Sequence, residues 1–478
     1  MYELVSPVSL PAVLRYCGGT FVGIGIVLLV PAAAAVFFGE TAAGMAALGC
    51  ALLSFAAGAA LLRHFPETDL EWKEALVLAA IAFPAASLLC TLPLSLSSGM
   101  NGIDAFFESV SGLTTTGLSV APVGVPAFFL FFRSWLQWVG GIGIVVLVLT
   151  FVVGPGTSAL RLYTASIGDE ERLRPTIGAT VRLLFSVYLA LTVVAFLLLL
   201  FGGMEPFDAL CHALSGISTG GFSTRPESVA AFGGVLPALV ILSSLMGAVS
   251  IGLYPALLKD PLRLLSDIQV QVFAVIAVAG FVLLLFILGG AMPLPEAVPV
   301  AAFQVLSALT TSGFSTIDIG ALPPPAKAVL SLLMCIGGSI GSTAGGIKIL
   351  RLILVLALIR YIFLRFSLPR EAVVPFRVGG HLMEWPDVYA VVGFIFCYIG
   401  CIILSALVFM LAGAGMEDAV FEVASALGTV GLSTGLTGPD LPVLLKAVLC
   451  IDMLMGRIEV MPFLVMFMPR TWIRPGRD

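Results

Sequence analysis

Charged residues are scarce in this chain of 478 residues: Asp, Glu, Lys and Arg make up 11%, against 59% hydrophobic residues. A soluble domain carries about 25% charged residues, so the composition excludes a water-soluble protein and indicates an integral membrane protein. The net charge of -5 excludes little, because partners depend on where charges lie.

Residues for catalysis and metal binding are also few. The three histidines, His64, His212 and His381, show no ligand spacing, and none of the eight cysteines lies in a CxxC motif. Cys397 and Cys401 share a helix face, but two thiols do not make a metal site, and we interpret all eight as small core residues. A membrane-embedded enzyme would need a nucleophile–base pair or a metal cluster, and the sequence offers neither.

Apolar segments long enough to cross about 30 Å of hydrocarbon predict about ten transmembrane helices. The alternating pattern of strand barrels is absent, so the expected fold class is all-α. The eighth segment is long and interrupted. The segments lie roughly at 14–37, 44–63, 74–96, 129–152, 179–203, 234–258, 268–290, 327–364, 387–413 and 441–468.

Basic residues predict the orientation. Most of them fall on the side of residue 1, among them Arg15, Arg63, Arg161, Arg172, Arg174 and Arg370, which places both termini in the cytoplasm. The opposite side keeps Arg133, Arg225, Lys327 and Lys446, while Lys348 and Arg457 lie within apolar segments. The first segment is longer than the core of a signal peptide, which favours a retained helix over a cleaved one.

A short Ser/Thr loop centred on glycine occurs four times, at 111–119, 215–223, 307–315 and 425–433. In each copy the glycine lies six residues after a leading serine and two before a trailing one. The repeat divides the chain into a two-helix extension (1–70) and four helix–pore loop–helix units. We place these units at 71–153, 154–264, 265–380, which contains the broken inner helix, and 381–478.

The apolar segments before the loops are too short to span a membrane and are expected to be re-entrant helices. Each begins with an acidic residue, which we interpret as an N-cap and dipole partner rather than an ion ligand. These are Asp104, Asp208, Glu296 and Asp418. Three residues before each leading serine is a polar side chain: Glu108, His212, Gln304 or Glu422. We expect Glu108 and Glu422 to form hydrogen bonds behind the loops.

Four such loops can form a ring of backbone carbonyl groups around a monovalent cation, because glycine allows the positive φ that turns them towards one axis. The alternative for any single loop is ordinary helix packing through small residues. Predicted ion-binding residues are Thr114, Thr115, Thr116, Gly117, Ser218, Thr219, Gly220, Gly221, Thr310, Thr311, Ser312, Gly313, Gly428, Thr429, Val430 and Gly431.

A gate is predicted below this filter. The glycine-rich stretch 337–346 cannot sustain a helix, so it should form a mobile strip that obstructs the pore from the cytoplasmic side; the alternative is a packing kink. Arg457 within the last segment sets a positive barrier, unless it pairs with Glu459 or Asp452. The predicted gate residues are Gly337, Gly338, Gly341, Ser342, Thr343, Gly345, Gly346, Lys348 and Arg457.

With the motifs at 137–143, 341–348 and 456–459, the chain resembles, over nearly its whole length, the TrkH/TrkG potassium-uptake subunits of the bacterial Trk/Ktr and plant HKT superfamily. The resemblance implies a homodimer with one potassium pore per protomer in the bacterial inner membrane. In that superfamily a serine at the first glycine position accompanies sodium permeation, so Gly117 favours potassium. It also implies gating by the 337–348 loop, Arg457 and a cytoplasmic TrkA-like ring.

No Rossmann-type unit lies in this chain, so a nucleotide (NAD or ATP) is expected only on that partner, and no nucleic acid is expected. The predicted function is gated potassium uptake. One alternative is an ion-coupled (Na⁺ or H⁺) symporter, for which Glu108, His212 and Glu422 are the available titratable groups. The other is a Na⁺/K⁺-conducting variant, because Gly220 and Gly428 depart from the pattern of the remaining loops.

Overall fold

The structure, a computed structural model, describes residues 7–68, 70–152, 177–257, 260–369, 374–378 and 381–472. These residues are helical apart from loops and one antiparallel pair of two-residue strands, β1 (Arg377–Val378) and β2 (His381–Leu382). The predicted all-α fold is confirmed. Both termini and the loops with Arg161, Arg172, Arg174 and Arg370, on which the orientation depends, lie outside the described residues.

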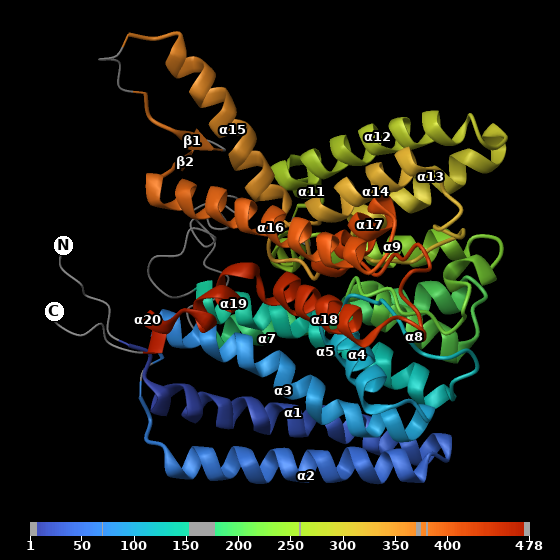
Figure 1. Cartoon of the computed structure of the whole chain (residues 1–478), viewed down its shortest axis with the longest axis vertical. Coiled ribbons are helices and arrows are strands. Elements are labelled where there is room, and N and C mark those ends of the chain that lie inside the picture. Colours follow the sequence, from blue (N-terminus) through green and yellow to red (C-terminus); the bar gives the residue numbers. More distant parts are fainter. Residues whose placement is uncertain are drawn as a thin grey trace.

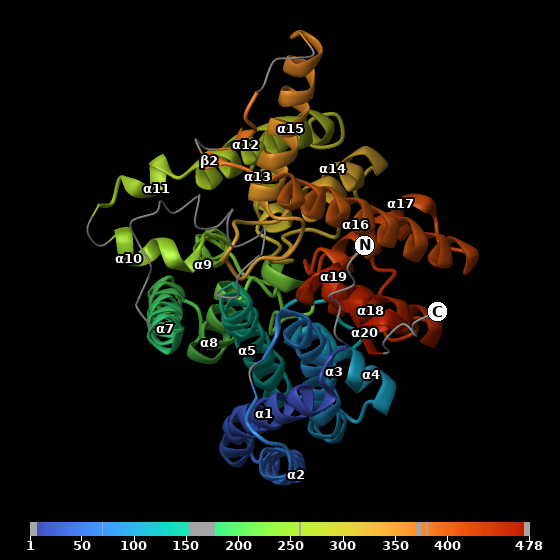
Figure 2. The same ribbon diagram turned by 90° about the vertical axis from the view of Figure 1, so that its left-hand side faces the viewer.

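The first two helices, α1 (Leu10–Phe38) and α2 (Thr41–His64), form a hairpin at one edge of the molecule (Figures 1 and 2). Small residues let their backbones approach closely, as is common between membrane helices. A Cβ atom on Gly58 would meet the carbonyl oxygen of Gly18 at 2.8 Å. Gly39 between the helices has a φ of 74° and caps α1.

Four units follow, each with an outer helix, a short helix, a loop and an inner helix, in the predicted order. The first contains α3 (Trp72–Ser98), α4 (Gly102–Leu113) and α5 (Ala127–Val152). The second contains α7 (Ile177–Phe201), α8 (Pro206–Ile217), η1 (Ser228–Ala231), α9 (Leu236–Ala248), η2 (Ile251–Leu253), α10 (Tyr254–Leu257) and α11 (Arg263–Ser266). The third contains α12 (Ile268–Leu288), α13 (Leu294–Leu309), α14 (Pro324–Ile336) and α15 (Ile349–Phe366). The fourth contains α16 (Trp385–Leu411), α17 (Met416–Leu427), α18 (Val443–Ile458), α19 (Val460–Phe467) and α20 (Pro469–Trp472).

By length and hydropathy, 6 described helices can cross a membrane, namely α1, α2, α3, α7, α12 and α16; the bent pair of α9 with η2–α10 makes 7. The predicted break of the eighth segment lies between α14 and α15. The sequence predicts the sixth and tenth segments as continuous helices, but in the structure each is broken. The helix axis turns by 83° after α9. Glu459, with a φ of 71°, separates α18 from α19, and hydropathy carries no signal for such a backbone conformation.

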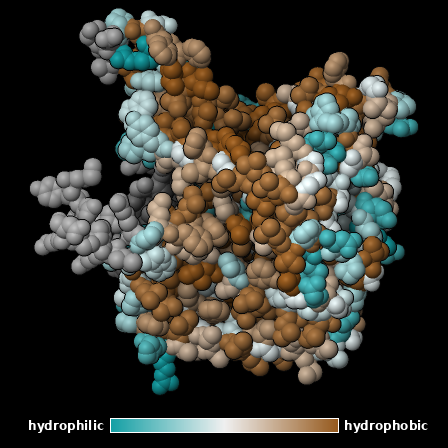
Figure 3. Space-filling model, in the orientation of Figure 1, coloured by the Kyte–Doolittle hydropathy of each residue, from teal (hydrophilic) through white to brown (hydrophobic). Residues whose placement is uncertain are grey.

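The outer helices expose large apolar side chains, including Phe37 of α1 (89% exposed) and Phe286 of α12 (83%). Figure 3 shows an apolar surface over the long helices, with polar residues gathered towards their ends. Such a continuous apolar belt is stable only when lipid covers it. The chain is therefore a membrane protein.

Candidate functional site

The four short helices α4, α8, α13 and α17 end in loops of the same backbone conformation. In each loop a threonine with positive φ follows the helix, and a glycine with positive φ comes two residues later. The threonine φ angles are 54° at Thr115, 53° at Thr219, 57° at Thr311 and 50° at Thr429. Left-handed conformation is uncommon for residues other than glycine and persists where the surrounding structure dictates it. Its fourfold occurrence shows that the repeat in the sequence is a repeat in structure.

The four loops meet in a closed cycle. A Cβ atom added to each central glycine would overlap a carbonyl oxygen of the next loop, so no side chain fits at these positions. The overlaps are Gly117 with Gly220, Gly221 with Ser312, Gly313 with Val430, and Gly431 with Thr116. The structure therefore brings together all the predicted filter residues. The hydroxyl residues before each glycine are buried, while the four glycines themselves are half-buried.

Serine side chains hold three of the loops in shape. Ser111 Oγ donates to the carbonyl oxygen of Leu118 (2.6 Å) and accepts from the amide of Gly117 (3.0 Å). Ser307 repeats the first of these bonds and Ser425 the second. This explains the six-residue spacing between leading serine and glycine. The hydroxyl of Ser215 in the second loop is buried and has no partner.

The polar residues of the short helices support the loops from behind. Each contacts the trailing serine of its own loop: Glu108 with Ser119 at 2.7 Å, His212 with Ser223 at 3.0 Å, Gln304 with Ser315 at 3.1 Å and Glu422 with Ser433 at 2.7 Å. Glu108 and Glu422 form hydrogen bonds behind the loops, as expected. These hydrogen bonds, made by four fully buried side chains, fix where each loop leaves the ring.

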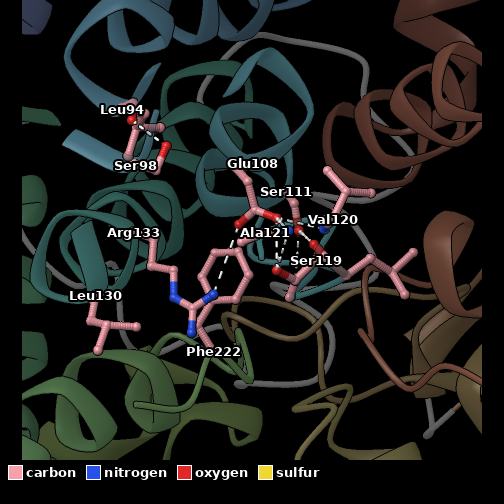
Figure 4. A network of polar contacts seen from close by, with 12 residues as sticks. Leu94, Ser98, Glu108, Ser111, Ser119, Val120, Ala121, Leu130, Arg133 and Phe222 are labelled. Atoms are coloured by element: carbon pink, nitrogen blue, oxygen red, sulfur yellow. Dashed lines mark hydrogen bonds and ion pairs between the residues drawn. The ribbon is translucent and has the colours of Figure 1, made fainter. Parts of the chain in front are cut away.

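Arg133 of α5 links the first two loops (Figure 4). Its Nη1 lies 3.9 Å from Glu108 Oε2, its Nη2 donates to the carbonyl oxygen of Ser223, and its guanidinium lies 4.6 Å from the ring centroid of Phe222. The charge thus lies behind the ring, paired with an acid. The sequence placed Arg133 on one side of the membrane but did not predict this role.

The acidic residues at the start of the short helices are not N-caps, which corrects the prediction. The capping residues are Asn101, Glu205, Pro293 and Gly415, so each acid lies three residues later, in the first turn. Three of these acids form ion pairs with basic residues that the sequence predicts on the side of the membrane opposite residue 1. These pairs are Asp104 with Lys446 (2.6 Å), Asp208 with Arg225 (2.9 Å) and Asp418 with Lys327 (2.8 Å). With Arg133 paired to Glu108, all four basic residues predicted on the side opposite residue 1 therefore have an acidic partner.

The segment between α14 and α15 lies directly against the ring. The amide of Gly345 donates to Thr311 Oγ1 (2.9 Å), and Thr343 Oγ1 donates to the carbonyl oxygen of Ile217 (2.9 Å). On its other side, the amide of Ile340 donates to Gln269 Oε1 of α12 (2.9 Å). Gln269 was missed; its signal was its position, with Gln271, at the start of an otherwise apolar helix.

Arg457 of α18 joins this segment to the first unit. Nη1 donates to the carbonyl oxygen of Thr343 (2.7 Å) and Nη2 to that of Gly140 (2.7 Å), and the residue is 3% exposed. The alternative carboxylate partners are engaged elsewhere in the described chain: Glu459 with Arg351 and Asp452 with Ser405. The salt-bridge alternative for Arg457 is therefore wrong, and a positive charge lies next to the segment below the ring.

Glycines also set how closely the inner helices approach the ring. A Cβ atom on Gly140, Gly247 or Gly456 would overlap the carbonyl oxygen of the last residue of the short helix in its own unit. Arg457 follows Gly456, where the equivalent residues are Gly141 and Ala248. Among these three units the basic side chain is thus particular to the fourth, and aligning their inner helices would have revealed this from sequence.

Comparisons with known proteins agree with this architecture. The family model described as TrkH, a cation transport protein, matches residues 44–472. An uncharacterised cation transporter of Methanocaldococcus jannaschii is 31% identical over 467 residues, 96% of this chain and 95% of its own. The Trk system potassium uptake protein TrkH of Halomonas elongata is 30% identical, with 97% and 99% covered. The crystal structure of the potassium transporter TrkH from Vibrio parahaemolyticus matches with a TM-score of 0.86 at 28% identity, covering 98% of this chain and 100% of that chain.

Proposed function

Since the chain belongs to the TrkH family of cation transport proteins, as its motifs predicted, we propose that it takes up potassium through a pore at the ring of four loops. Membership also confirms that it is a transporter and not an enzyme. The observation that supports the proposal most strongly is the closed cycle of Gly117, Gly221, Gly313 and Gly431 against neighbouring carbonyl groups. Such a ring supplies the oxygens that replace the hydration shell of a potassium ion.

In this proposal the backbone of the filter residues binds the ion, which is the substrate and needs no further cofactor. The C-terminal ends of α4, α8, α13 and α17 precede the loops directly, so each adds partial negative charge near the ring. The buried links from Glu108, His212, Gln304 and Glu422 keep the loops from collapsing around a smaller ion.

The gate in this proposal consists of Gly337, Gly338, Gly341, Ser342, Thr343, Gly345, Gly346, Lys348 and Arg457. The 337–348 segment contacts the ring from below, and Arg457 fastens it to α5 through the carbonyl groups of Thr343 and Gly140. Opening requires these two hydrogen bonds to break, and a guanidinium near the path opposes a cation until then. This role for Arg457 is supported by its hydrogen bonds, which go to backbone carbonyl groups, so no carboxylate in the described part of the chain neutralises its charge.

We further infer a homodimer in the bacterial inner membrane, with cytoplasmic termini and a TrkA-like cytoplasmic ring that brings the nucleotide. Helix α15 follows the gate segment directly and extends beyond the bundle (Figure 1), with Phe363 and Phe366 exposed (70% and 84%). A helix so placed can contact a second copy or a regulatory ring and transmit its movement to the gate. A monomeric mass of the purified protein in mild detergent, measured by light scattering, would contradict the dimer.

The alternatives receive less support. A symporter needs titratable groups free to bind and release the coupling ion, but Glu108, His212 and Glu422 are buried and hydrogen-bonded to the loops. A sodium-conducting variant was considered because of Gly220 and Gly428. A Cβ atom on Gly428 would lie 2.7 Å from the carbonyl oxygens of Ala424 and Met334, so the fourth loop is closely packed at this position.

Uptake of rubidium, a potassium substitute, into proteoliposomes tests the proposal. Flux should follow the rubidium gradient and the membrane potential, and should stay the same when sodium is omitted or the pH gradient is collapsed. A requirement for a sodium or proton gradient would favour the symporter. Protein-free liposomes are the control, and absence of rubidium flux even after the gate is removed would contradict the proposed function.

A further inference from the structure

Gln137 lies in the middle of α5, four residues after Arg133, and is fully buried. Its side-chain amide reaches the second loop, although Gln137 belongs to the first unit. Nε2 donates to the carbonyl oxygen of Gly220, and Oε1 accepts from the amide of Phe222 at 3.1 Å. The two bonds hold the two peptide groups on either side of Gly221. A buried amide that satisfies both its functions on one loop acts as a clasp.

The second loop lacks one restraint that the other three contain, the hydrogen bond of the leading serine hydroxyl. The side-chain hydroxyl of its leading serine, Ser215, has no hydrogen-bond partner among the described residues, whereas the hydroxyls of Ser111, Ser307 and Ser425 bond to their own loops. The residue before its central glycine is another glycine, Gly220, where the other loops have Thr116, Ser312 and Val430. Two consecutive glycines have the largest freedom to rotate, so this loop depends on restraint from outside.

We propose that Gln137 is a positioning residue that sets ion preference by locking the peptide groups around Gly221. The inference rests on the proposed function of the ring as a potassium filter. The Gly220 carbonyl group held by Gln137 is the one against which Gly117 of the first loop packs. Gln137 therefore fixes the contact between the first and second loops, and a change there alters the size of the whole ring.

Shape complementarity supports the pairing of Gln137 with Gly220. A Cβ atom on Gly220 would lie 2.6 Å from Gln137 Oε1 and 2.7 Å from Nε2. The clasp thus requires the absence of a side chain at position 220. Gly220 makes the second loop more flexible, and the side-chain amide of Gln137 from the neighbouring helix restrains it. The residues at positions 137 and 220 therefore depend on each other.

The first experiment compares rubidium and sodium uptake by proteoliposomes containing Gln137→Leu, which keeps the volume but removes both bonds. The rubidium-to-sodium ratio should fall by about 5-fold or more, as expected for the loss of two hydrogen bonds. Ser244→Ala is the matched control, because Ser244 is equally buried three residues before Gly247, as Gln137 is before Gly140. An unchanged ratio in Gln137→Leu would overturn the clasp while leaving the filter proposal intact.

A second experiment tests the clasp even if the Gln137→Leu protein transports neither ion. It enlarges the residue at position 220 and then shortens the side chain at position 137. Gly220→Ala should reduce rubidium uptake, because the new methyl group collides with Gln137. The double variant Gln137→Ala, Gly220→Ala should recover uptake relative to Gly220→Ala, because the methyl group then has room. Failure to recover would overturn the clasp. Absence of flux through the protein even after the gate is removed would instead count against the proposed function.

Discussion

Replacement of Arg457 by alanine should raise rubidium flux through the isolated protein by about 30-fold. A unit charge about 8 Å from a permeating cation opposes it by roughly 2 kcal/mol at an effective dielectric constant of about 20, which corresponds to that factor. The variant also removes the two hydrogen bonds that fasten Thr343 and Gly140. Flux is measured in proteoliposomes without a cytoplasmic partner, where the closed state of the parent protein keeps it low.

Arg457→Lys is the matched variant for this result. Lysine keeps the charge but lacks the planar fork that reaches two carbonyl groups, so flux should rise less than in Arg457→Ala. Deleting about five residues from 338–346 should raise flux as well. Arg457→Ala and the deletion both disrupt the same closed gate. Combining them should therefore raise flux by less than the sum of their separate effects. Flux in Arg457→Ala equal to that of the parent protein would remove Arg457 from the gate.

A serine in place of Gly117 should reduce the preference for potassium over sodium by about 10-fold or more. Gly117 has a φ of 91°, a conformation that costs an ordinary residue about 1–2 kcal/mol. Its new Cβ atom would also overlap the carbonyl oxygen of Gly220, so the first and second loops must move apart. Each 1.4 kcal/mol lost in binding one ion relative to the other is a factor of ten in preference.

Gly39→Ser separates the two contributions. Gly39 has a φ of 74°, and a Cβ atom there has no neighbour within 4 Å. This control therefore carries similar backbone strain without disturbing the ring, and its rubidium-to-sodium uptake ratio should equal that of the parent protein. Should Gly117→Ser retain the ion preference of the parent, the first loop would not contribute to selection.

Much of the site could be predicted because the sequence repeats it. The six-residue spacing from Ser111 to Gly117, and from Ser425 to Gly431, reflects a hydrogen bond within one loop, and the same spacing marks all four copies. The break before Lys348 followed from glycine content, which is a local property. The family resemblance then rested on motifs that coincide with these features.

What could not be predicted depends on contacts between units. Nothing local to Glu459 indicates a left-handed backbone; its carboxylate is bound by Arg351, which lies 108 positions earlier in the chain. The partners of Arg457 are carbonyl groups, which every residue has, so the sequence suggested carboxylates instead. Likewise, Gln137 was visible only as part of a motif, and its role required knowing that α5 packs against the second loop.

The most direct measurement is the location of rubidium in crystals of the protein by anomalous scattering. A potassium filter at the ring predicts anomalous density on the axis enclosed by Gly117, Gly221, Gly313 and Gly431, at distances suited to coordination by backbone oxygens. Rubidium bound only elsewhere, with that axis empty at a concentration that supports uptake, would contradict it.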